Sequence, residues 1–216
     1  ISIVGDVKKW KEAVENNFVM RREKMPAQRT FLEPVDHKTV VKTVKKKVAN
    51  TYCVMGFKTV PRGHKDSYVF DVINGILGRG QSGKMFTEIR GKRGFAYDVG
   101  TQHVAEVSFG YFAVYASIDK KNLALVKKLA LEELQKLKQA TEVDLKESKD
   151  YIEGDYLLEL EDCQKVADQF LFWEQVREAR SMNEFLKQIQ KVTQKDISRV
   201  VDKYLKHYTM IVIEGK

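Results

Sequence analysis

The sequence has few of the residues that mark disulfide frameworks, metal centres and membrane spans. Its 216 residues include two cysteines and three prolines, and Cys53 and Cys163 show neither disulfide nor metal-site spacing. No apolar run approaches the roughly 18 residues that a membrane-spanning helix needs. The first residues lack the basic-then-apolar order of a signal peptide. We therefore expect a soluble protein, cytoplasmic or periplasmic if bacterial, although the sequence specifies no compartment.

Residues that would supply independent catalysis are also absent or scattered. The chain has four isolated histidines: His37, His64, His103 and His207. No His-x-x-x-His, Cys-x-x-Cys or His-Glu-x-x-His spacing occurs, so we expect no metal site made by this chain alone. The Gly-x-Ser-x-Gly sequence of serine hydrolases is missing, and neither Ser82 nor Ser108 has an evident His and Asp arrangement. Nucleophilic catalysis by this chain therefore has no support.

The first 38 residues read as the end of one unit and a connection to the next. The chain begins with Ile rather than Met, and residues 1–7 predict a short strand that ends at Gly5, followed by a helix through Phe18. Apolar periodicity then disappears in a stretch that holds Pro26 and Pro34, which indicates a linker over residues 19–38. We expect a processed or truncated product, with residues 1–18 ending an earlier domain.

Residues 39–216 predict a second domain of α+β class. Strands are predicted over residues 39–48, 51–58, 94–103, 107–118 and 209–214, with a helix over 66–77 and mostly helices after 119. We expect the first two strands to form a hairpin and the third and fourth to be antiparallel neighbours. This order predicts a mainly antiparallel sheet with helices on one face.

Three Ser/Thr-x-x-Asp/Glu sequences predict the starts of helices in the C-terminal half. They begin at Thr141, Ser181 and Thr193. In this capping pattern the hydroxyl and the carboxylate each satisfy an otherwise unpaired backbone N–H. A further helix is predicted over residues 162–179.

The net charge of +8 would suit an acidic partner. The densest basic cluster, Lys42 to Lys47, lies in a strand-like segment with valines between the lysines. No aromatic stacking residues interleave with it, which favours a solvated strand face over a nucleic-acid site. We expect no nucleic-acid partner, and salt-dependent binding by this cluster is the weaker alternative.

The most distinctive stretch is residues 77–97, which contain a glycine loop, a short helix and a strand start. Gly78-x-x-x-x-Gly83-Lys84 matches most of the phosphate-binding P-loop pattern. However, Met85 stands where a Ser or Thr hydroxyl should bind magnesium, and a helix precedes the loop in place of a strand. Nucleotide binding is therefore not favoured.

Arg90 and Tyr97 are the two residues of this stretch with useful chemistry. We predict Arg90 at the end of the short helix and Tyr97 two residues into the strand, with a turn at Gly91 to Gly94 between them. A guanidinium and a phenolic hydroxyl can both donate hydrogen bonds to a carbonyl oxygen that becomes negative. In the alternative, Arg90 pairs with a nearby acid and Tyr97 packs in the core. Spacing alone favours that alternative.

The same stretch resembles the pitrilysin and mitochondrial processing peptidase family of zinc metallopeptidases, in the C-terminal half of its members. The family pattern is Leu-Gly-Gly-Gly, a Ser-Ser-Arg-Leu-Phe type segment, and Glu-Ile-Arg-Glu-Lys-Arg-Gly-Leu-Ala-Tyr. It reads here as Leu77-Gly-Arg-Gly80, Ser82-Gly-Lys-Met-Phe86 and Glu88-Ile-Arg-Gly-Lys-Arg-Gly-Phe-Ala-Tyr97. The chain departs from the pattern at Arg79, Gly83, Lys84 and Gly91.

This resemblance implies two related α+β domains that enclose a chamber for an unfolded peptide. The family's zinc is held in the N-terminal domain by His-x-x-Glu-His and a distal Glu, which this chain lacks. Arg90 and Tyr97 correspond to an arginine and tyrosine pair that contacts the substrate near the scissile carbonyl and the developing oxyanion. Gly78, Gly80 and Gly83 correspond to a substrate-binding loop.

The resemblance therefore implies the substrate-binding C-terminal half of a zinc metalloendopeptidase. Alone, this half is expected to be inactive and to bind no metal. The expected partners are an N-terminal zinc domain or a homologous subunit, in a homodimer or heterodimer, together with a peptide substrate. The alternative is a catalytically inactive partner or scaffold subunit of the same family.

Overall fold

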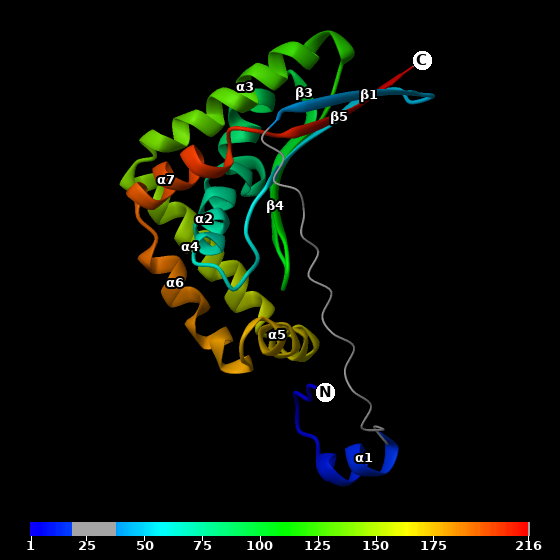
Figure 1. Cartoon of the computed structure of the whole chain (residues 1–216), viewed down its shortest axis with the longest axis vertical. Helices are drawn as coiled ribbons and strands as arrows, with labels where there is room; N and C mark the ends of the chain where they lie inside the picture. The colour runs from blue at the N-terminus through cyan, green and yellow to red at the C-terminus, as the bar shows by residue number, and fades with distance from the viewer. Residues whose placement is uncertain (19–37, 216) are drawn as a thin grey trace.

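The computed structural model describes residues 1–18 and 38–215 of the chain. Residues 38–215 form one sheet with helices packed against one of its faces, as expected from the sequence (Figure 1). The strands are β1 (Val40–Lys46), β2 (Thr51–Lys58), β3 (Ala96–Ala105), β4 (Gly110–Ile118) and β5 (Thr209–Gly215). The α-helices are α1 (Trp10–Asn17), α2 (Asp66–Gly78), α3 (Leu123–Lys136), α4 (Glu142–Glu159), α5 (Cys163–Val176), α6 (Phe185–Lys191) and α7 (Gln194–Tyr204).

Shorter helical turns join these elements. They are η1 (Gly80–Ser82), η2 (Phe86–Gly91), η3 (Lys120–Asn122), η4 (Leu137–Gln139) and η5 (Ala179–Glu184), of which η2 is a π-helix and the others are 3₁₀ turns. The predicted order of a helix, a glycine loop, a second short helix and a strand is therefore present as α2, η1, η2 and β3.

The sheet has the strand order β1-β5-β2-β4-β3. β3 and β4 are antiparallel neighbours, as predicted, and β2 pairs antiparallel with both β4 and β5. The predicted hairpin of β1 and β2 is wrong, because β5 lies between them and pairs in parallel with β1. The short connection between β1 and β2 suggested local pairing, but the C-terminal strand takes that position.

The core lies between the inner face of the sheet and helix α2. Nine of the thirteen residues of α2 are buried, so this helix is apolar nearly all round and lies inside the domain. Alternate residues of β2 face it, with Cys53, Met55 and Phe57 all buried. Burial of each large side chain of this kind contributes roughly 1.5–3 kcal/mol to folding.

A buried carboxylate fixes the start of α2 to α7. Asp66 accepts hydrogen bonds from Arg199 Nη2 at 2.7 Å and from the Tyr204 hydroxyl at 2.9 Å. Burial alone would raise the pKa of Asp66, but these two partners outweigh it and the pKa is lowered. The first and the last helices of this domain are thereby held together.

The short strand predicted within residues 1–7 pairs with no described residue, and as the last strand of an earlier domain it stays a prediction. Strands require a neighbour to satisfy their backbone groups. The predicted helix is present as α1, and none of its residues is buried. The predicted linker over residues 19–38 lies outside the described residues, apart from Lys38, and the domain boundaries stay predictions.

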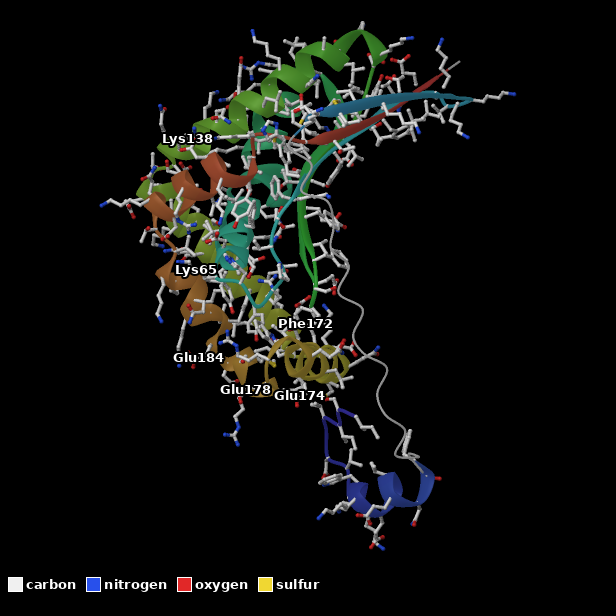
Figure 2. All side chains as sticks on the ribbon, viewed as in Figure 1. Lys65, Lys138, Phe172, Glu174, Glu178 and Glu184 are labelled. Carbon is white, nitrogen blue, oxygen red and sulfur yellow. The ribbon has the colours of Figure 1, made fainter. Side chains whose placement is uncertain are left out.

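Two of the three predicted capping boxes are confirmed. Thr141 with Asp144 opens α4, and Thr193 with Asp196 opens α7, each with both reciprocal hydrogen bonds. The third is wrong, since Ser181 lies inside η5 and Glu184, labelled in Figure 2, precedes α6 without a side-chain cap. The helix predicted over residues 162–179 is α5, with the Asp162 carboxylate as its N-cap.

The other face of the sheet is open in the part of the chain that the structure describes. Val54 of β2 lies beside Tyr115 of β4 and Ile211 of β5, and their exposed fractions are 47%, 38% and 38%. Tyr52 and Tyr111 are also exposed on their strands. Lys42, Lys45 and Lys46 of the basic cluster lie on the edge strand β1, where charged side chains commonly oppose unwanted strand pairing, and Lys47 directly follows it.

Candidate functional site

The π-helix η2 is a rigid base for Arg90. Its neighbour Met85 and its own residue Ile89 are completely buried, so the segment is anchored in the core. The Lys92 N–H donates to the Thr87 carbonyl at 2.9 Å, which is the i to i−5 bond of a π-turn. Such turns are rare and often occur at functional sites.

The turn from η2 to β3 is closed by two backbone hydrogen bonds. The Gly94 N–H donates to the Arg90 carbonyl at 2.9 Å, and the Phe95 N–H donates to the Ile89 carbonyl at 3.1 Å. Gly94 has φ of +64°, a conformation that glycine adopts without steric cost. The backbone position of Tyr97 is therefore fixed relative to Arg90.

Arg90 is exposed at the end of η2. Its guanidinium carbon lies 5.0 Å from the centre of the Phe86 ring, and it forms no ion pair with any residue in 1–18 or 38–215. The nearby carboxylate of Glu88 instead accepts from Lys92 at 2.5 Å and from Arg93 at 2.9 Å. Hydrogen bonds from Lys92 and then Arg93 hold the pKa of Glu88 below its usual range. The guanidinium of Arg90 is thus left available to another molecule.

Tyr97 occupies a β-bulge at the start of β3. Ala96 pairs with Ile118 and Asp98 pairs with Ser117, so Tyr97 is an extra residue in the ladder. Bulges redirect side chains and are frequent beside active sites. The Tyr97 side chain is 54% exposed and so does not pack in the core.

The Tyr97 hydroxyl donates a hydrogen bond to Asp119 Oδ1 at 3.1 Å. This bond, with the negative charge of Asp119, raises the pKa of Tyr97. Sequence reasoning missed Asp119. The antiparallel pairing of β3 with β4 could have indicated it, because Asp119 directly follows the residue opposite Ala96.

The three glycines of the predicted substrate-binding loop each have a reason within the chain. A Cβ at Gly78 would lie 2.2 Å from Thr101 Oγ1 of β3, and a Cβ at Gly83 would lie 2.5 Å from the Leu77 carbonyl oxygen. Gly80 has φ of +58°. These glycines permit close packing of the loop on α2 and β3, and a role in substrate binding stays a prediction.

Two departures from the family pattern face α4. Arg79 forms a salt bridge with Glu147, and Lys84 Nζ lies 2.7 Å from Asp144 Oδ2. Burial would raise the pKa of Asp144, but the bonds from Lys84 and Thr141 lower it overall. Both basic residues therefore fix the glycine loop to the first two turns of α4.

A metal centre is not built by the described residues. Within 1–18 and 38–215, no group of three or more His, Cys, Asp or Glu side chains could hold a metal ion. His64 Nδ1 accepts from the Asp66 N–H, and His103 contacts Asp71, while His37 lies outside the described ranges.

No described helix is long and apolar enough to cross a membrane.

Comparison with known proteins gives consistent relatives. The chain is 28% identical over 162 residues to the uncharacterized zinc protease YmxG of Bacillus subtilis, and 26% identical over 166 residues to the uncharacterized zinc protease SCO5738 of Streptomyces coelicolor. These matches cover 74% of this chain, but only 37% and 36% of the relatives. The chain thus spans little more than a third of their length.

Solved structures share the fold. A protease from Helicobacter pylori matches 98% of this chain and 53% of its own with a TM-score of 0.85 and 21% identity. A peptidase M16 inactive domain from Pseudomonas fluorescens matches 89% of this chain and 47% of its own with a TM-score of 0.76 and 19% identity. A family profile described as the peptidase M16 inactive domain matches residues 1–152. The chain therefore belongs to the peptidase M16 inactive-domain family of zinc-protease-like proteins.

Proposed function

We propose that this chain is the substrate-binding half of a zinc endopeptidase and contributes Arg90 and Tyr97 to an active site whose metal belongs to another half. The observation that carries this proposal is the exposed pair on fixed supports, Arg90 on η2 and Tyr97 in the bulge of β3. Since the described residues offer no set of metal ligands, zinc would have to be held by the other half.

The chemistry of the pair suits a peptide carbonyl. A guanidinium donates from a planar fork and a phenol donates one O–H, so both can stabilise negative charge that develops on an oxygen. Arg90 forms no ion pair within the described ranges and can donate directly. Tyr97 would have to transfer its hydrogen bond from Asp119 to the substrate oxygen.

The open face of the sheet offers a surface for an extended peptide. Tyr52, Val54, Tyr115 and Ile211 form an exposed row of aromatic and aliphatic side chains on three adjacent strands. Contiguous apolar patches of this kind mark binding surfaces in soluble domains. Side chains of this sort would bind an unfolded segment with little sequence preference.

The exposed apolar side chains of residues 1–18 favour a further domain or subunit that packs against this segment. Ile1, Ile3, Val7, Trp10 and Phe18 are between 42% and 62% exposed, and α1 buries none of its eight residues. A helix this short is marginal without tertiary packing. The zinc-bearing half, or a homologous subunit, is the natural cover for these side chains.

The test is the kinetics of peptide hydrolysis by this chain assembled with its metal-bearing half. Removing one oxyanion donor commonly lowers kcat by about a hundredfold or more. We expect Tyr97→Phe and Arg90→Ala to lower kcat, with Tyr151→Phe on α4 and Arg93→Ala as matched controls that leave it near wild type. Unchanged turnover in both variants would remove the proposed roles.

A second candidate is a catalytically inactive partner or scaffold subunit. The observation that favours it is the hydrogen bond from Tyr97 to Asp119, because a hydroxyl that has donated its one proton cannot donate it to a substrate. In that case the assembled complex would still bind peptide on the open sheet face. Peptide binding without hydrolysis, equal in wild type and Tyr97→Phe, would identify this role.

A further inference from the structure

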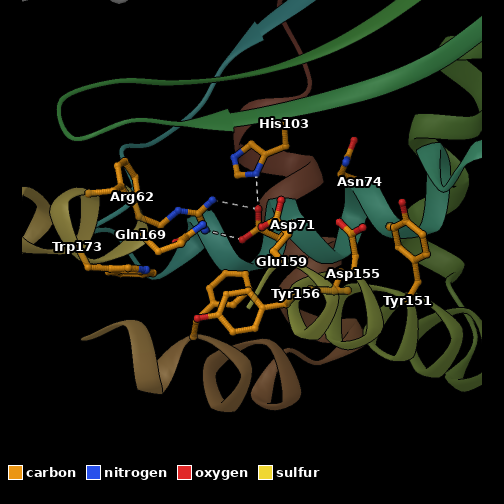
Figure 3. A pocket seen from close by; sticks show the side chains of 14 residues that line it. Arg62, Asp71, Asn74, His103, Tyr151, Asp155, Tyr156, Glu159, Gln169 and Trp173 are labelled. Carbon is orange, nitrogen blue, oxygen red and sulfur yellow. Dashed lines mark hydrogen bonds and ion pairs between the residues drawn. The ribbon is translucent and has the colours of Figure 1, made fainter. Parts of the chain in front are cut away.

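A pocket of about 260 Å³ lies between α2, α4 and α5, on the helical side of the sheet (Figure 3). Its walls are aromatic, and they come from the two helices α4 and α5 and from the start of α6. The wall residues are Tyr151, Tyr156, Phe172, Trp173 and Phe185. Trp173 is almost fully buried, whereas Tyr151 is exposed at the mouth.

The floor of the pocket is a network of three charged or polar side chains. Arg62 donates to both carboxylate oxygens of Asp71, at 2.5 and 3.2 Å, and His103 Nδ1 lies 2.7 Å from Asp71 Oδ1. Burial would raise the pKa of Asp71, but the charge of Arg62 and the contacts of His103 lower it to about 2. The Arg62 guanidinium and the Asp71 carboxylate therefore form a bidentate ion pair in which each compensates the charge of the other.

One nitrogen atom of the floor, Nε2 of His103, can still form a hydrogen bond. The His103 side chain is 1% exposed, and its Nε2 is buried without a hydrogen-bond partner among the described residues. Buried polar atoms are normally paired, and an unpaired one calls for a bound water or ligand. When Nδ1 donates to Asp71, the Nε2 of a neutral ring is an acceptor.

The mouth of the pocket is acidic. Asp155 and Glu159 lie four residues apart on α4 and so share one helix face, and both line the pocket together with Asn74 of α2 (Figure 3). Asp155 has no ion pair within the described ranges, and Glu159 reaches Lys165 at 3.5 Å. The lining thus holds three carboxylates against one guanidinium, which is already occupied by Asp71.

We propose that this pocket binds a small organic cation, an alkylammonium or alkylguanidinium group. Aromatic rings attract such cations through their faces, and the carboxylates at the mouth supply negative charge that compensates the charge of the cation. The wall residue Phe185 already accepts a guanidinium, since the guanidinium carbon of Arg62 lies 5.7 Å from its ring centre. An anion would meet the carboxylate of Asp155, unpaired within the described residues, and that of Glu159, while the guanidinium of Arg62 is already paired with Asp71.

Neither Arg90 nor Tyr97 lines this pocket. His103 shares a face of β3 with the buried residues Val99 and Thr101, which point toward the helices. The open row of Val54 and Tyr115 lies on the opposite face. Cation binding therefore neither requires nor tests the proposed peptidase role.

The test uses fluorescence of the 216-residue chain and agmatine, which carries a guanidinium and an ammonium on a short alkyl chain. The chain has two tryptophans, so Trp10→Phe leaves Trp173 as the only reporter. We expect saturable quenching of Trp173 with a Kd of roughly 1 mM or tighter, a modest affinity typical of a small polar ligand. The neutral 1,4-butanediol, of the same chain length, should give no saturable change.

The variant Asp155→Asn combined with Glu159→Gln should weaken agmatine binding at least tenfold. Asp150→Asn is the matched control, because Asp150 loses the same kind of charge from the same helix but does not line the pocket. Absence of saturable quenching by agmatine, or equal weakening by Asp150→Asn, would overturn the proposal.

A second arm distinguishes the source of the cation. The tripeptide Gly-Arg-Gly, with blocked ends, presents the same guanidinium as a protein side chain. Binding as tight as that of agmatine would indicate a basic side chain as the occupant, and binding of agmatine alone would indicate a free amine. Either result supports the cation site, and failure of both contradicts it.

Discussion

At the scale of single residues, the hydroxyl of Tyr97 is the most informative group. Asp119 accepts a hydrogen bond from this hydroxyl, which raises the pKa of Tyr97. We predict that Asp119→Asn lowers the pKa of Tyr97 toward the ordinary value near 10, because the negative acceptor is lost. Absorbance titration would measure this, with the Tyr97→Phe variant subtracted to isolate one of nine tyrosines. An unchanged difference curve would show that the bond is not made in solution.

Asp71 predicts how stability depends on pH. Its pKa is lowered from 3.8 to about 2 in the folded chain, so its contribution is present above the unfolded value and lost as pH falls through about 2. The loss amounts to roughly 2 kcal/mol. Urea unfolding at pH values between about 4 and 2 would measure it against Asp71→Asn, which should show a shallower loss in this window.

The same residue predicts a large mutational cost. Asp71→Asn leaves the Arg62 guanidinium buried without its counter-charge, which typically destabilises by roughly 3 kcal/mol or more. Asp155→Asn, at the exposed mouth of the same pocket, should change the free energy of unfolding by less than about 0.5 kcal/mol. Comparable losses in the two variants would mean that the floor network is not buried in solution.

At the scale of elements, two glycine substitutions should have opposite signs. A Cβ at Gly83 would lie 2.5 Å from the Leu77 carbonyl oxygen and 2.9 Å from the Arg79 nitrogen, so Gly83→Ala should cost roughly 1–3 kcal/mol. Gly154 lies within α4 with nothing within 4 Å of its added Cβ. Gly154→Ala should stabilise by about 0.5–1 kcal/mol. Thermal unfolding measures both, and the same sign in the two variants would contradict this packing.

Elements set by local sequence were predictable, and those set by distant partners were not. Helix α2, the loop after it and the pair of β3 and β4 follow from apolar spacing over a few residues. The parallel pairing of β1 with β5 joins residues about as far apart as the domain allows, and no local pattern encodes it. The strand predicted within residues 1–7 has no neighbour among the described residues, and a strand requires one, so it stays a prediction.

In the candidate site, too, the features set by local sequence were predictable and the contacts between distant elements were not. Arg90 and Tyr97 lie on one continuous motif, and their predicted positions at the end of a short helix and the start of a strand are those observed. Asp119 contacts Tyr97 across the ladder, and Arg62 and His103 meet at Asp71 from different elements. Such contacts depend on strand register and helix packing, which a single sequence does not specify.

At the scale of the whole molecule, residues 1–18 contribute little to the stability of the described domain. Since α1 buries no residue, we predict that deleting residues 1–18 changes the Tm of the chain by less than about 2 °C. Scanning calorimetry would measure it. A large fall in Tm would show that residues 1–18 pack on the described domain, and it would contradict the proposal that another half covers them.

The central claim is that this chain completes a peptidase that neither half can form alone. The most direct measurement is hydrolysis of an unstructured peptide by the zinc-bearing half, by this chain, and by their mixture. We predict turnover only in the mixture, and a fall of about a hundredfold or more when this chain carries Arg90→Ala and Tyr97→Phe together. Equal turnover by the zinc-bearing half without this chain, or by the mixture with the double variant, would contradict the claim.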